Sequence, residues 1–505
     1  MISFIQKHQE QISCTLSCFD RVVLTGTLPD ICYDKAMTSY LYNHHIKIFD
    51  YPKWAEGLKN QLKNHMELVA HNSEISIDYI RKQKSFRKEE QIKEIIAQRG
   101  DHPGIVHIYS AMESCSAYRP WHNKQSHQTY IKSTSGKCLH YYIYFIDKTF
   151  GLCYMRIPTW SPFRLQVYFN GHYWLAQQLQ RHGIDYEMRE NAFTSLSDPE
   201  KAQQLANSLN AKQLHKKLEE WTKAYCPIIS NFDRQYHWSF MQVEWATDIV
   251  FKQQKQFQPL YEAITRRAVI DIKADQIATF LGRKMTGQYR DEMGNDFSTR
   301  IQGTRIRHKM GSTSIKLYDK FAMIARVECT SNNINFFKIR REVEQRNGDI
   351  VMKNAPLRKN IYSMKALRKL MEAANQRYLN YMASIDNPDS GQKACEKIAR
   401  PAKEKNRSYR GFNFLQEQDI KLFCTIMRGE WTISGFRAKD LRAYMTNLTS
   451  SQSSYLLKRL RTHGIIKKVG HCYKYYISTF GQQVLATVLK LKQELIIPAL
   501  CKSSV

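Results

Sequence analysis

The last quarter of the chain, from Phe412 to Leu489, carries the pattern that most constrains how this protein folds. Its apolar residues recur first at helical spacing and then alternate as in strands. Serines that begin one segment and a glycine that ends it mark the limits of a helix. The segment therefore predicts three helices, a two-stranded hairpin and a final helix: Ile420–Met427, Phe436–Tyr444, Ser450–Gly464, the strands Ile465–Val469 and Tyr473–Ile477, and a helix from Thr479.

This order of elements is typical of a winged helix-turn-helix domain. The third helix and the hairpin carry polar and basic side chains that fit a major groove and its flanking phosphates. Duplex DNA is therefore the expected partner, through Ser453, Lys458, Arg459 and Arg461 of the helix and Lys467, Lys468 and Lys474 of the hairpin. A winged helix that binds another protein is the alternative, but the basic charge favours DNA.

The whole chain is strongly basic, with a formal net charge of +30 over 505 residues. A field of that sign attracts polyanions, so nucleic acid is the leading partner, DNA first and RNA second. An anionic membrane is a weaker alternative, because no basic amphipathic anchor is evident, and no membrane partner is expected. Residues 386–411 form a predicted basic linker, in which Arg400, Lys403, Lys405 and Arg407 are expected to lie on phosphates.

No apolar stretch reaches the roughly 18 residues of a membrane span, and residues 1–8 lack the apolar region of a signal peptide. We therefore expect a cytoplasmic protein. The 12 cysteines are scattered without a CxxC pair, so most are expected to be reduced and packed. A metal held by Cys14, Cys18 and distant histidines is the alternative interpretation of the closest pair.

The chain predicts a multidomain α+β protein, in which helical insertions surround a central mixed or antiparallel β region. The expected regions are 1–100, mainly helical; 101–197, β-rich; 198–296, helical; 297–385, a hairpin plus a helix; the linker 386–411; and the winged helix 412–495. In the β-rich region, alternation places His140, Tyr142 and Tyr144 on one sheet face. Such a face can stack on bases, and it can equally pack inside a core.

The densest polar signal lies between Arg305 and Thr330, where two strands joined by a turn fit the pattern. If these strands pair antiparallel, five side chains are expected on one polar surface: His308, Lys316, Tyr318, Arg326 and Glu328. The residues offer distinct roles: a divalent cation, Mg²⁺ or Mn²⁺, on Asp319 and Glu328; a nucleophile in Tyr318; phosphate-binding cations in Lys316 and Arg326; and a general acid or base in His308. An ordinary cross-strand ion-pair network is the alternative.

The run Gly311-Ser312-x-Ser314-x-x-x-Tyr318-Asp319-Lys320, followed by Arg326-x-Glu328, resembles the core motif of plasmid and phage replication initiators. The resemblance covers a short part of the chain and implies a tyrosine that nicks one DNA strand with the help of a divalent metal. The chain departs from the better-known nickases, because it lacks a pair of histidines around one apolar residue. The overall organisation also resembles an uncharacterised bacterial family associated with mobile elements.

The leading hypothesis is a nucleic-acid-binding protein of a bacterial mobile element that cuts or joins a DNA strand, as a replication initiator or transposase does. The alternative is a non-catalytic DNA-binding or structured-RNA-binding protein, or a transcriptional regulator. Because the chain has no P-loop, GxSxG, HExxH or dinucleotide glycine motif, nothing in it supports ATP-driven, hydrolase-triad or hydride-transfer chemistry.

Overall fold

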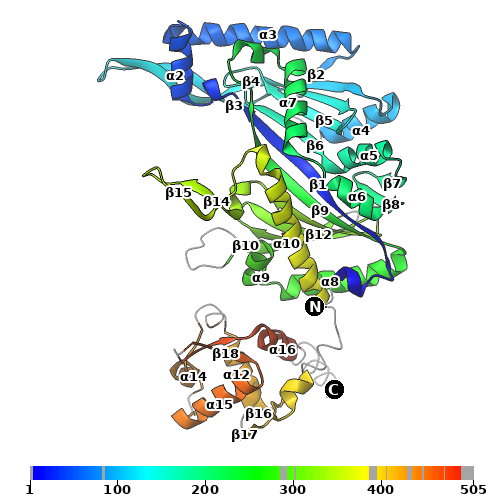
Figure 1. Ribbon diagram of the computed structural model, residues 1–505, viewed down its shortest axis with the longest axis vertical. Coiled ribbons are helices and arrows are strands. Elements are labelled where there is room, and N and C mark those ends of the chain that lie inside the picture. The colour runs from blue at the N-terminus through cyan, green and yellow to red at the C-terminus, as the bar shows by residue number, and fades with distance from the viewer. Residues whose placement is uncertain are drawn as a thin grey trace. The chain divides into compact units, whose positions relative to one another are not determined.

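The computed structural model describes residues 4–81, 86–284, 293–300, 303–385, 395–404, 407–428, 431, 435–445, 448–470 and 473–490. The chain divides into two compact units, Met1–Ile385 and Asp386–Val505 (Figure 1). Helices combine with one large mixed sheet, which confirms the predicted α+β class.

The first unit is organised around a sheet that has eleven strands within the described residues, in the order β10-β11-β12-β13-β9-β1-β6-β5-β4-β3-β2. Their bounds are β1 Ile12–Thr27, β2 Ile77–Tyr79, β3 Gly104–Asn123, β4 Gln128–Asp147, β5 Gly151–Pro158, β6 Leu165–Asn170, β9 His237–Phe251, β10 Met293–Arg300, β11 Gly303–Met310, β12 Thr313–Lys320 and β13 Ile324–Ser331. Neighbouring strands are antiparallel except β2 and β3. Two hairpins stand apart from the sheet: β7 Tyr186–Arg189 with β8 Ala192–Leu196, and β14 Lys338–Glu344 with β15 Ile350–Pro356.

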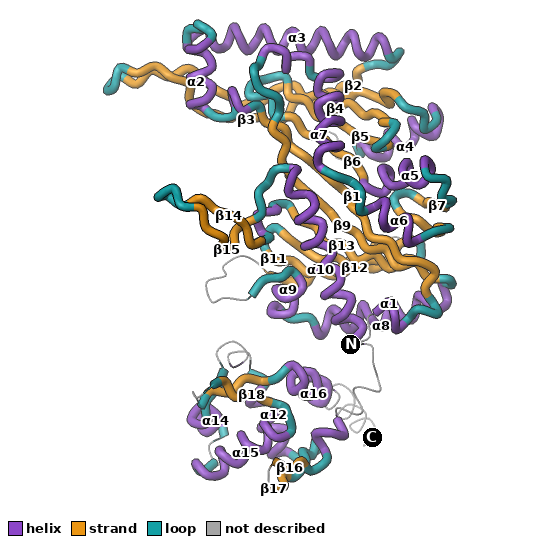
Figure 2. The backbone as a smooth tube through the Cα atoms, in the orientation of Figure 1, coloured by secondary structure: helices purple, strands orange, loops and turns teal. Residues whose placement is uncertain are grey.

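The helices of this unit are α1 Phe4–Lys7, α2 Asp34–Asn43, α3 Tyr51–Asn72, α4 Lys88–Arg99, α5 Gly171–Arg181, α6 Pro199–Ala206, α7 Ala211–Tyr225, α8 Gln254–Asp271, α9 Ala274–Phe280 and α10 Met364–Ile385 (Figure 2). Short 3₁₀ turns span Pro29–Ile31, Ile48–Asp50, Pro227–Asn231, Ile334–Phe336 and Ile361–Ser363. None of the helices in the described part of the chain is long and apolar enough to cross a membrane.

One face of the sheet is apolar and carries the main core. Helices α3, α7 and α10 supply buried residues to this core, among them Leu62, Leu218 and Met371. Helix α10 crosses β9 and β13, where the buried amide of Asn375 donates hydrogen bonds to the backbone carbonyls of Trp245 and Val327. These bonds satisfy a polar group that would otherwise destabilise the core.

The opposite face is more polar, and α4 covers its β3–β5 end with a smaller apolar cluster. His140, Tyr142 and Tyr144 share this face, but they are 1%, 7% and 4% exposed. Tyr142 also donates a hydrogen bond of 2.6 Å to Glu113. The aromatic stripe is therefore packed inside the protein, which was the second of the two predicted outcomes, and offers no open platform for bases.

The regions predicted between residues 1 and 385 contribute to the same sheet rather than to separate compact units. The expectation of a helical region over 198–296 is wrong at β9, because His237–Phe251 is a central strand. The region 1–100, expected to be mainly helical, also contains the strand β2 at Ile77–Tyr79. Strands buried on both faces lack alternation, so β9 is hard to distinguish from a buried helix.

The second unit contains β16 Ala402–Glu404, β17 Arg407–Tyr409, α12 Glu417–Ile426, α14 Ala438–Tyr444, α15 Ser450–Thr462, β18 Ile466–Val469, β19 Lys474–Ile477 and α16 Thr479–Lys490. These elements share a core that includes Phe423, Leu441, Leu460 and Leu485. Helix α15 begins with a capping box, in which Thr449 and Gln452 exchange side-chain and backbone hydrogen bonds. The predicted helices and hairpin of this segment occur within a few residues of their expected bounds.

Candidate functional site

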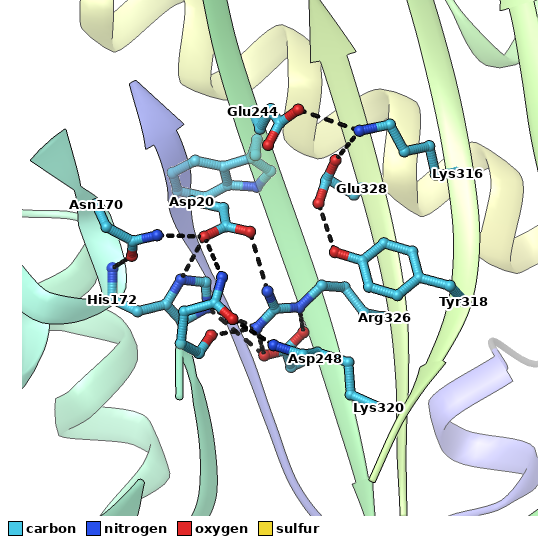
Figure 3. Close-up of polar contacts among 12 residues, drawn as sticks. Asp20, Asn170, His172, Glu244, Asp248, Lys316, Tyr318, Lys320, Arg326 and Glu328 are labelled. Carbon is cyan, nitrogen blue, oxygen red and sulfur yellow. Dashed lines mark hydrogen bonds and ion pairs between the residues drawn. The ribbon is translucent and has the colours of Figure 1, made fainter. Parts of the chain in front are cut away.

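Ionisable side chains of the first unit gather on the polar face of the sheet in a group that we call the central cluster: Asp20, His172, Glu244, Asp248, Lys316, Tyr318, Arg326 and Glu328 (Figure 3). Strand register explains the grouping. Lys316 lies opposite Glu328, and Arg326 lies opposite both Tyr318 and Asp248. Directly opposed residues in antiparallel strands point to the same face.

The first half of the central cluster is built on Glu328, which is 2% exposed. The Lys316 ammonium donates to Glu328 Oε1 at 2.6 Å and to Glu244 Oε1 at 3.1 Å. The Tyr318 hydroxyl donates to Glu328 Oε2 at 2.7 Å. Thr330 adds a third donor, at 3.0 Å from Glu328 Oε1. Glu328 is therefore satisfied by three neighbouring side chains.

The second half is built on Arg326, whose side chain is fully buried. Its guanidinium forms a bidentate pair with Asp248, at 2.5 and 2.6 Å, and reaches Asp20 Oδ2 at 3.0 Å. It also donates to the carbonyl of Asn191 at 2.6 Å and lies 3.1 Å from His172 Nε2. These contacts surround the guanidinium and link β13 to β9, β1, α5 and the turn between β7 and β8. Arg326 therefore does not present a free cation to a phosphate.

Asp20 is placed by an irregularity in β1, where the register with β9 shifts between Phe19 and Val22. A β-bulge at this position turns the side chain of the extra residue. The Asp20 carboxylate then accepts hydrogen bonds of 2.7 Å from the amides of Asn170 and Asn191. Asn170 also caps α5 through the backbone N–H of His172.

The pKa shifts of the carboxylates differ between the two halves of the central cluster. Burial acts to raise the pKa of Asp248, but Arg326 and His172 together outweigh it and lower that pKa to about 2. Burial and the neighbouring Glu328 raise the pKa of Glu244 to about 7. Burial and Glu328 also raise the pKa of Tyr318 well above its usual value. In this arrangement Tyr318 is a hydrogen-bond donor at neutral pH, so its use as a nucleophile requires a base that takes its proton.

Three carboxylates of the central cluster could hold a metal ion. One oxygen each from Asp20, Glu244 and Glu328 lies within 4.8 Å of the other two. An all-oxygen set suits Mg²⁺ or Mn²⁺. The Lys316 ammonium already lies between Glu244 and Glu328, so a dication bound to all three would have to displace it.

The predicted pairing of Asp319 with Glu328 is wrong. The two residues occupy opposite faces of the sheet, because Asp319 follows Tyr318 by one position and side chains alternate along a strand. Burial raises the pKa of Asp319 to about 6. Asp20 and Glu244 take the place that the sequence assigned to Asp319.

The predicted place of His308 is also wrong. Its opposite neighbour is Ile315, so its side chain points into the apolar core, where it is fully buried. The ring bonds to Asn295 Oδ1 at 2.7 Å and to the Tyr378 hydroxyl at 3.1 Å, and burial lowers its pKa to about 4. Register instead puts Arg307 opposite Lys316 on the polar face.

Four members of the central cluster were missed from the sequence: Asp20, His172, Glu244 and Asp248. Glu244 and Asp248 stand four positions apart in a mostly apolar, largely buried strand, so they share one face of β9. A carboxylate inside a buried strand requires a partner, which is a signal that the sequence does contain. His172 and Asp20 come together only through long-range contacts.

In the second unit, two predicted DNA-contacting residues of α15 are wrong. Ser453 is fully buried, and its hydroxyl donates to the carbonyl of Ser450. Arg459 is 1% exposed and pairs with Asp419 at 2.9 and 3.1 Å. It also donates to the carbonyl of Gly411 at 2.6 Å. Both side chains face the core of the unit, because they lie on the inner side of the helix.

The remaining predicted cations lie on the surface of this unit. Lys458 and Lys467 are exposed, whereas Lys468 and Lys474 are partly buried and lie over tyrosine rings, 4.3 Å from Tyr473 and 5.8 Å from Tyr476. Arg461 pairs with Glu404.

Helices α14 and α15 and strand β19 border a surface hollow of about 510 Å³. Its lining residues, all within the described part of the chain, are Arg437, Ala438, Lys439, Ser454, Leu457, Lys458, Arg461, Tyr473 and Tyr475. Four of them are cationic and none is acidic, so the hollow attracts an anionic partner. We call it the basic hollow.

The predicted linker is partly folded into the second unit, which corrects the expectation of a free basic segment. Ile398 belongs to its core, and Tyr409 is buried. The side chain of Arg400 is 78% exposed and pairs with Glu396. Lys403 and Arg407 are exposed on β16 and β17, and Lys405 lies outside the described residues.

The cysteines in the described part of the chain are free thiols, and Cys14 and Cys18 are both buried on β1. Comparison of the chain with protein-family models, with curated proteins and with solved structures gave no match. Functional inference therefore depends on the chemistry of these two sites.

Proposed function

We propose that this protein binds duplex DNA through its second unit, which we interpret as a winged helix-turn-helix with α15 as the recognition helix. The order of α12, α14, α15, the β18–β19 hairpin and α16 supports this interpretation. In such domains the recognition helix enters the major groove while neighbouring elements contact the backbone. The basic hollow is the observation that carries the proposal, because it gathers four cations beside this helix.

The geometry assigns different tasks to the cations of α15. Lys458 is exposed, lines the basic hollow and is expected to contact a phosphate. Arg461 is 38% exposed and is partly neutralised by Glu404, so its contact with DNA requires that pair to open or to be shared. Arg459 stabilises the fold of the unit and takes no part in contact with DNA.

Fluorescence anisotropy with a labelled duplex tests the proposal. Lys458→Ala should weaken binding by up to about tenfold at moderate salt and flatten the salt dependence by about one unit of slope. Lys421→Ala is the matched control, because Lys421 is an exposed lysine of α12 that does not line the basic hollow. Equal affinity and equal slope for the two variants would refute the assignment. Tighter binding of structured RNA than of duplex DNA would instead favour the RNA alternative.

A second candidate function, cleavage of a DNA strand at the central cluster, is favoured by one observation. The Tyr318 hydroxyl donates to Glu328, and Glu328 is also one of the three carboxylates whose oxygens lie within 4.8 Å. Glu328 is thus placed to accept the phenolic proton. A divalent ion held by Asp20, Glu244 and Glu328 would stabilise negative charge on a phosphate. DNA binding is the better supported function, because the central cluster is buried and its charges are already paired.

Strand cleavage is tested with labelled single-stranded DNA and Mg²⁺ or Mn²⁺. Activity at this site predicts cleavage that is lost in Tyr318→Phe and in Glu328→Gln, with a covalent protein–DNA adduct that Tyr318→Phe alone abolishes. Asp319→Asn is the control and should retain full cleavage, since Asp319 lies on the other face of the sheet. Binding without cleavage under either metal would eliminate this candidate and leave the first in place.

A further inference from the structure

The longest hairpin of the first unit extends beyond the sheet. Residues 114–137, which we call the β3–β4 arm, pair only with each other. Strand β2 stops pairing with β3 at Ser110, and β5 begins to pair with β4 at His140. Figure 1 shows the arm as the cyan hairpin that extends past α2. The arm is therefore a two-stranded ribbon with two faces of its own.

One face of the arm is anchored to the first unit. Tyr118 is buried and donates a hydrogen bond of 2.7 Å to the carbonyl of Ile31. The backbone N–H of Ile131, itself buried, donates to the Thr38 hydroxyl of α2 at 3.0 Å. Tyr42 of α2 donates to the carbonyl of Thr129 at 3.0 Å, close to the tip. These contacts hold the ribbon in one orientation, so binding a partner costs less ordering entropy.

The other face of the arm presents cations and aromatic rings. Strand register places Arg119 opposite Lys132 and Trp121 opposite Tyr130. The Arg119 guanidinium and the Lys132 ammonium lie 5.1 and 4.8 Å from the centre of the Trp121 ring. Trp121 is nevertheless 38% exposed. Two like charges directly opposite each other destabilise a ribbon, so this pair is better explained by an anionic partner than by the fold.

The composition of the arm leaves that charge uncompensated. Residues 114–137 contain Arg119, Lys124, Lys132 and Lys137, together with His122 and His127, and no Asp or Glu. Within the part of the chain that the structure describes, no carboxylate forms an ion pair with Arg119 or Lys132. The tip is thus a concentrated positive patch on a narrow element.

We propose that the β3–β4 arm is a second DNA-binding element, which inserts as a ribbon into a groove of duplex DNA. A two-stranded ribbon fits the width of the major groove. Arg119 and Lys132 contact phosphates, and the Trp121 ring packs against sugars or base edges between them. The inference deepens the proposed function, since it assigns a further contact to the same partner, but it stands on residues of the other unit.

Binding of the full-length chain to a labelled duplex, measured across a range of salt concentrations, tests the arm. The variant Arg119→Ala/Lys132→Ala should bind about tenfold to a hundredfold more weakly near 0.1 M salt and flatten the slope by about two units, as expected for two lost phosphate contacts. Lys212→Ala/Lys223→Ala is the matched control, because it removes two exposed lysines from α7 of the same unit. It should bind as the parent chain does.

The outcomes separate the two proposals. Parent-like binding by the arm variant, with weaker binding by Lys458→Ala, overturns the arm and leaves the proposed function intact. Weaker binding by the arm variant alone supports the arm and overturns the role of α15. A loss confined to structured RNA or to anionic vesicles also overturns the arm. Should the double variant misfold, Lys132→Gln keeps the test decisive, with an expected loss of about one unit of slope.

Discussion

Replacing Arg326 with methionine leaves two buried carboxylates without the cation that they share. Asp20 and Asp248 are 4% and 2% exposed, and neither can recover solvent without disrupting β1 or β9. Arg326 helps to lower the pKa of Asp248 from 3.8 to about 2, which corresponds to about 2 kcal/mol at neutral pH. Breaking a buried ion pair by removing one partner typically costs about 3–5 kcal/mol, so we expect a loss of that size for Arg326→Met.

The loss of stability in Arg326→Met is expected to depend on pH. In the native chain, the lowered pKa of Asp248 contributes stability that is present above its unfolded pKa and is lost as the pH falls through the folded value. In Arg326→Met the counter-charge that remains beside both carboxylates is His172, 3.3 Å from Asp20 and 3.5 Å from Asp248, so the pKa of both carboxylates rises relative to the native chain, and a raised pKa destabilises as the pH rises through it. The deficit relative to the native chain should therefore grow as the pH rises above about 2, the pKa of Asp248 in the native chain, and level off once the carboxylates of the variant have ionised.

Urea unfolding followed by circular dichroism measures the deficit. Arg234→Met is the control, because Arg234 is 70% exposed and its pair with Asp30 should contribute less than about 1 kcal/mol. Asp248→Asn combined with Arg326→Met should recover part of the loss, since it removes one of the orphaned charges. A deficit of less than about 1 kcal/mol, or one that does not change with pH, would refute the reasoning about the central cluster.

Three further predictions follow from the same structure. Burial and Glu328 raise the pKa of Glu244 to about 7, so its contribution to stability is present at acid pH and is lost as the pH rises through about 7. In Glu244→Gln the urea concentration at the unfolding midpoint should therefore change less with pH across that window. Arg459→Met should destabilise the second unit by about 3–5 kcal/mol, seen as a lower urea midpoint of its unfolding transition, and should leave the salt slope of DNA binding unchanged under conditions in which the unit stays folded. Terbium luminescence should report ion binding that Glu328→Gln abolishes and Asp319→Asn preserves; the reverse order would restore Asp319 as the ligand.

The C-terminal elements could be predicted because local signals coincide there. A capping box at Thr449, the glycine at 464 and two alternating strands each mark an element within a few residues. The sequence did not predict which side chains of α15 point toward the core and which point toward solvent. Ser453 and Arg459 look like DNA contacts by residue type, yet helical geometry turns both toward the core, where Arg459 meets Asp419.

The central cluster was predicted only in part, since it depends on pairing across distant strands. The hairpin of β12 and β13 was evident, so Lys316, Tyr318 and Glu328 were placed together correctly. The register of β11 moved His308 to the opposite face, because a shift of one residue reverses every side chain. Asp20 lies 306 positions before Arg326 in the chain, and no local pattern brings the two together.

The β3–β4 arm illustrates a different limit. Its strands contain serine, threonine, glycine and basic residues in place of apolar alternation, so the sequence signal was limited to the inner part of β4 around His140, Tyr142 and Tyr144. Pairing with the opposite strand and contacts to α2 stabilise the rest.

The salt dependence of duplex binding by the full-length chain tests the central claim most directly. The four cations of the basic hollow alone predict that the logarithm of the affinity falls linearly with the logarithm of salt concentration, with a slope of about −3 or steeper. A duplex that is not retained near 0.05 M salt, or an affinity that salt leaves unchanged, would contradict DNA binding as the function of this protein.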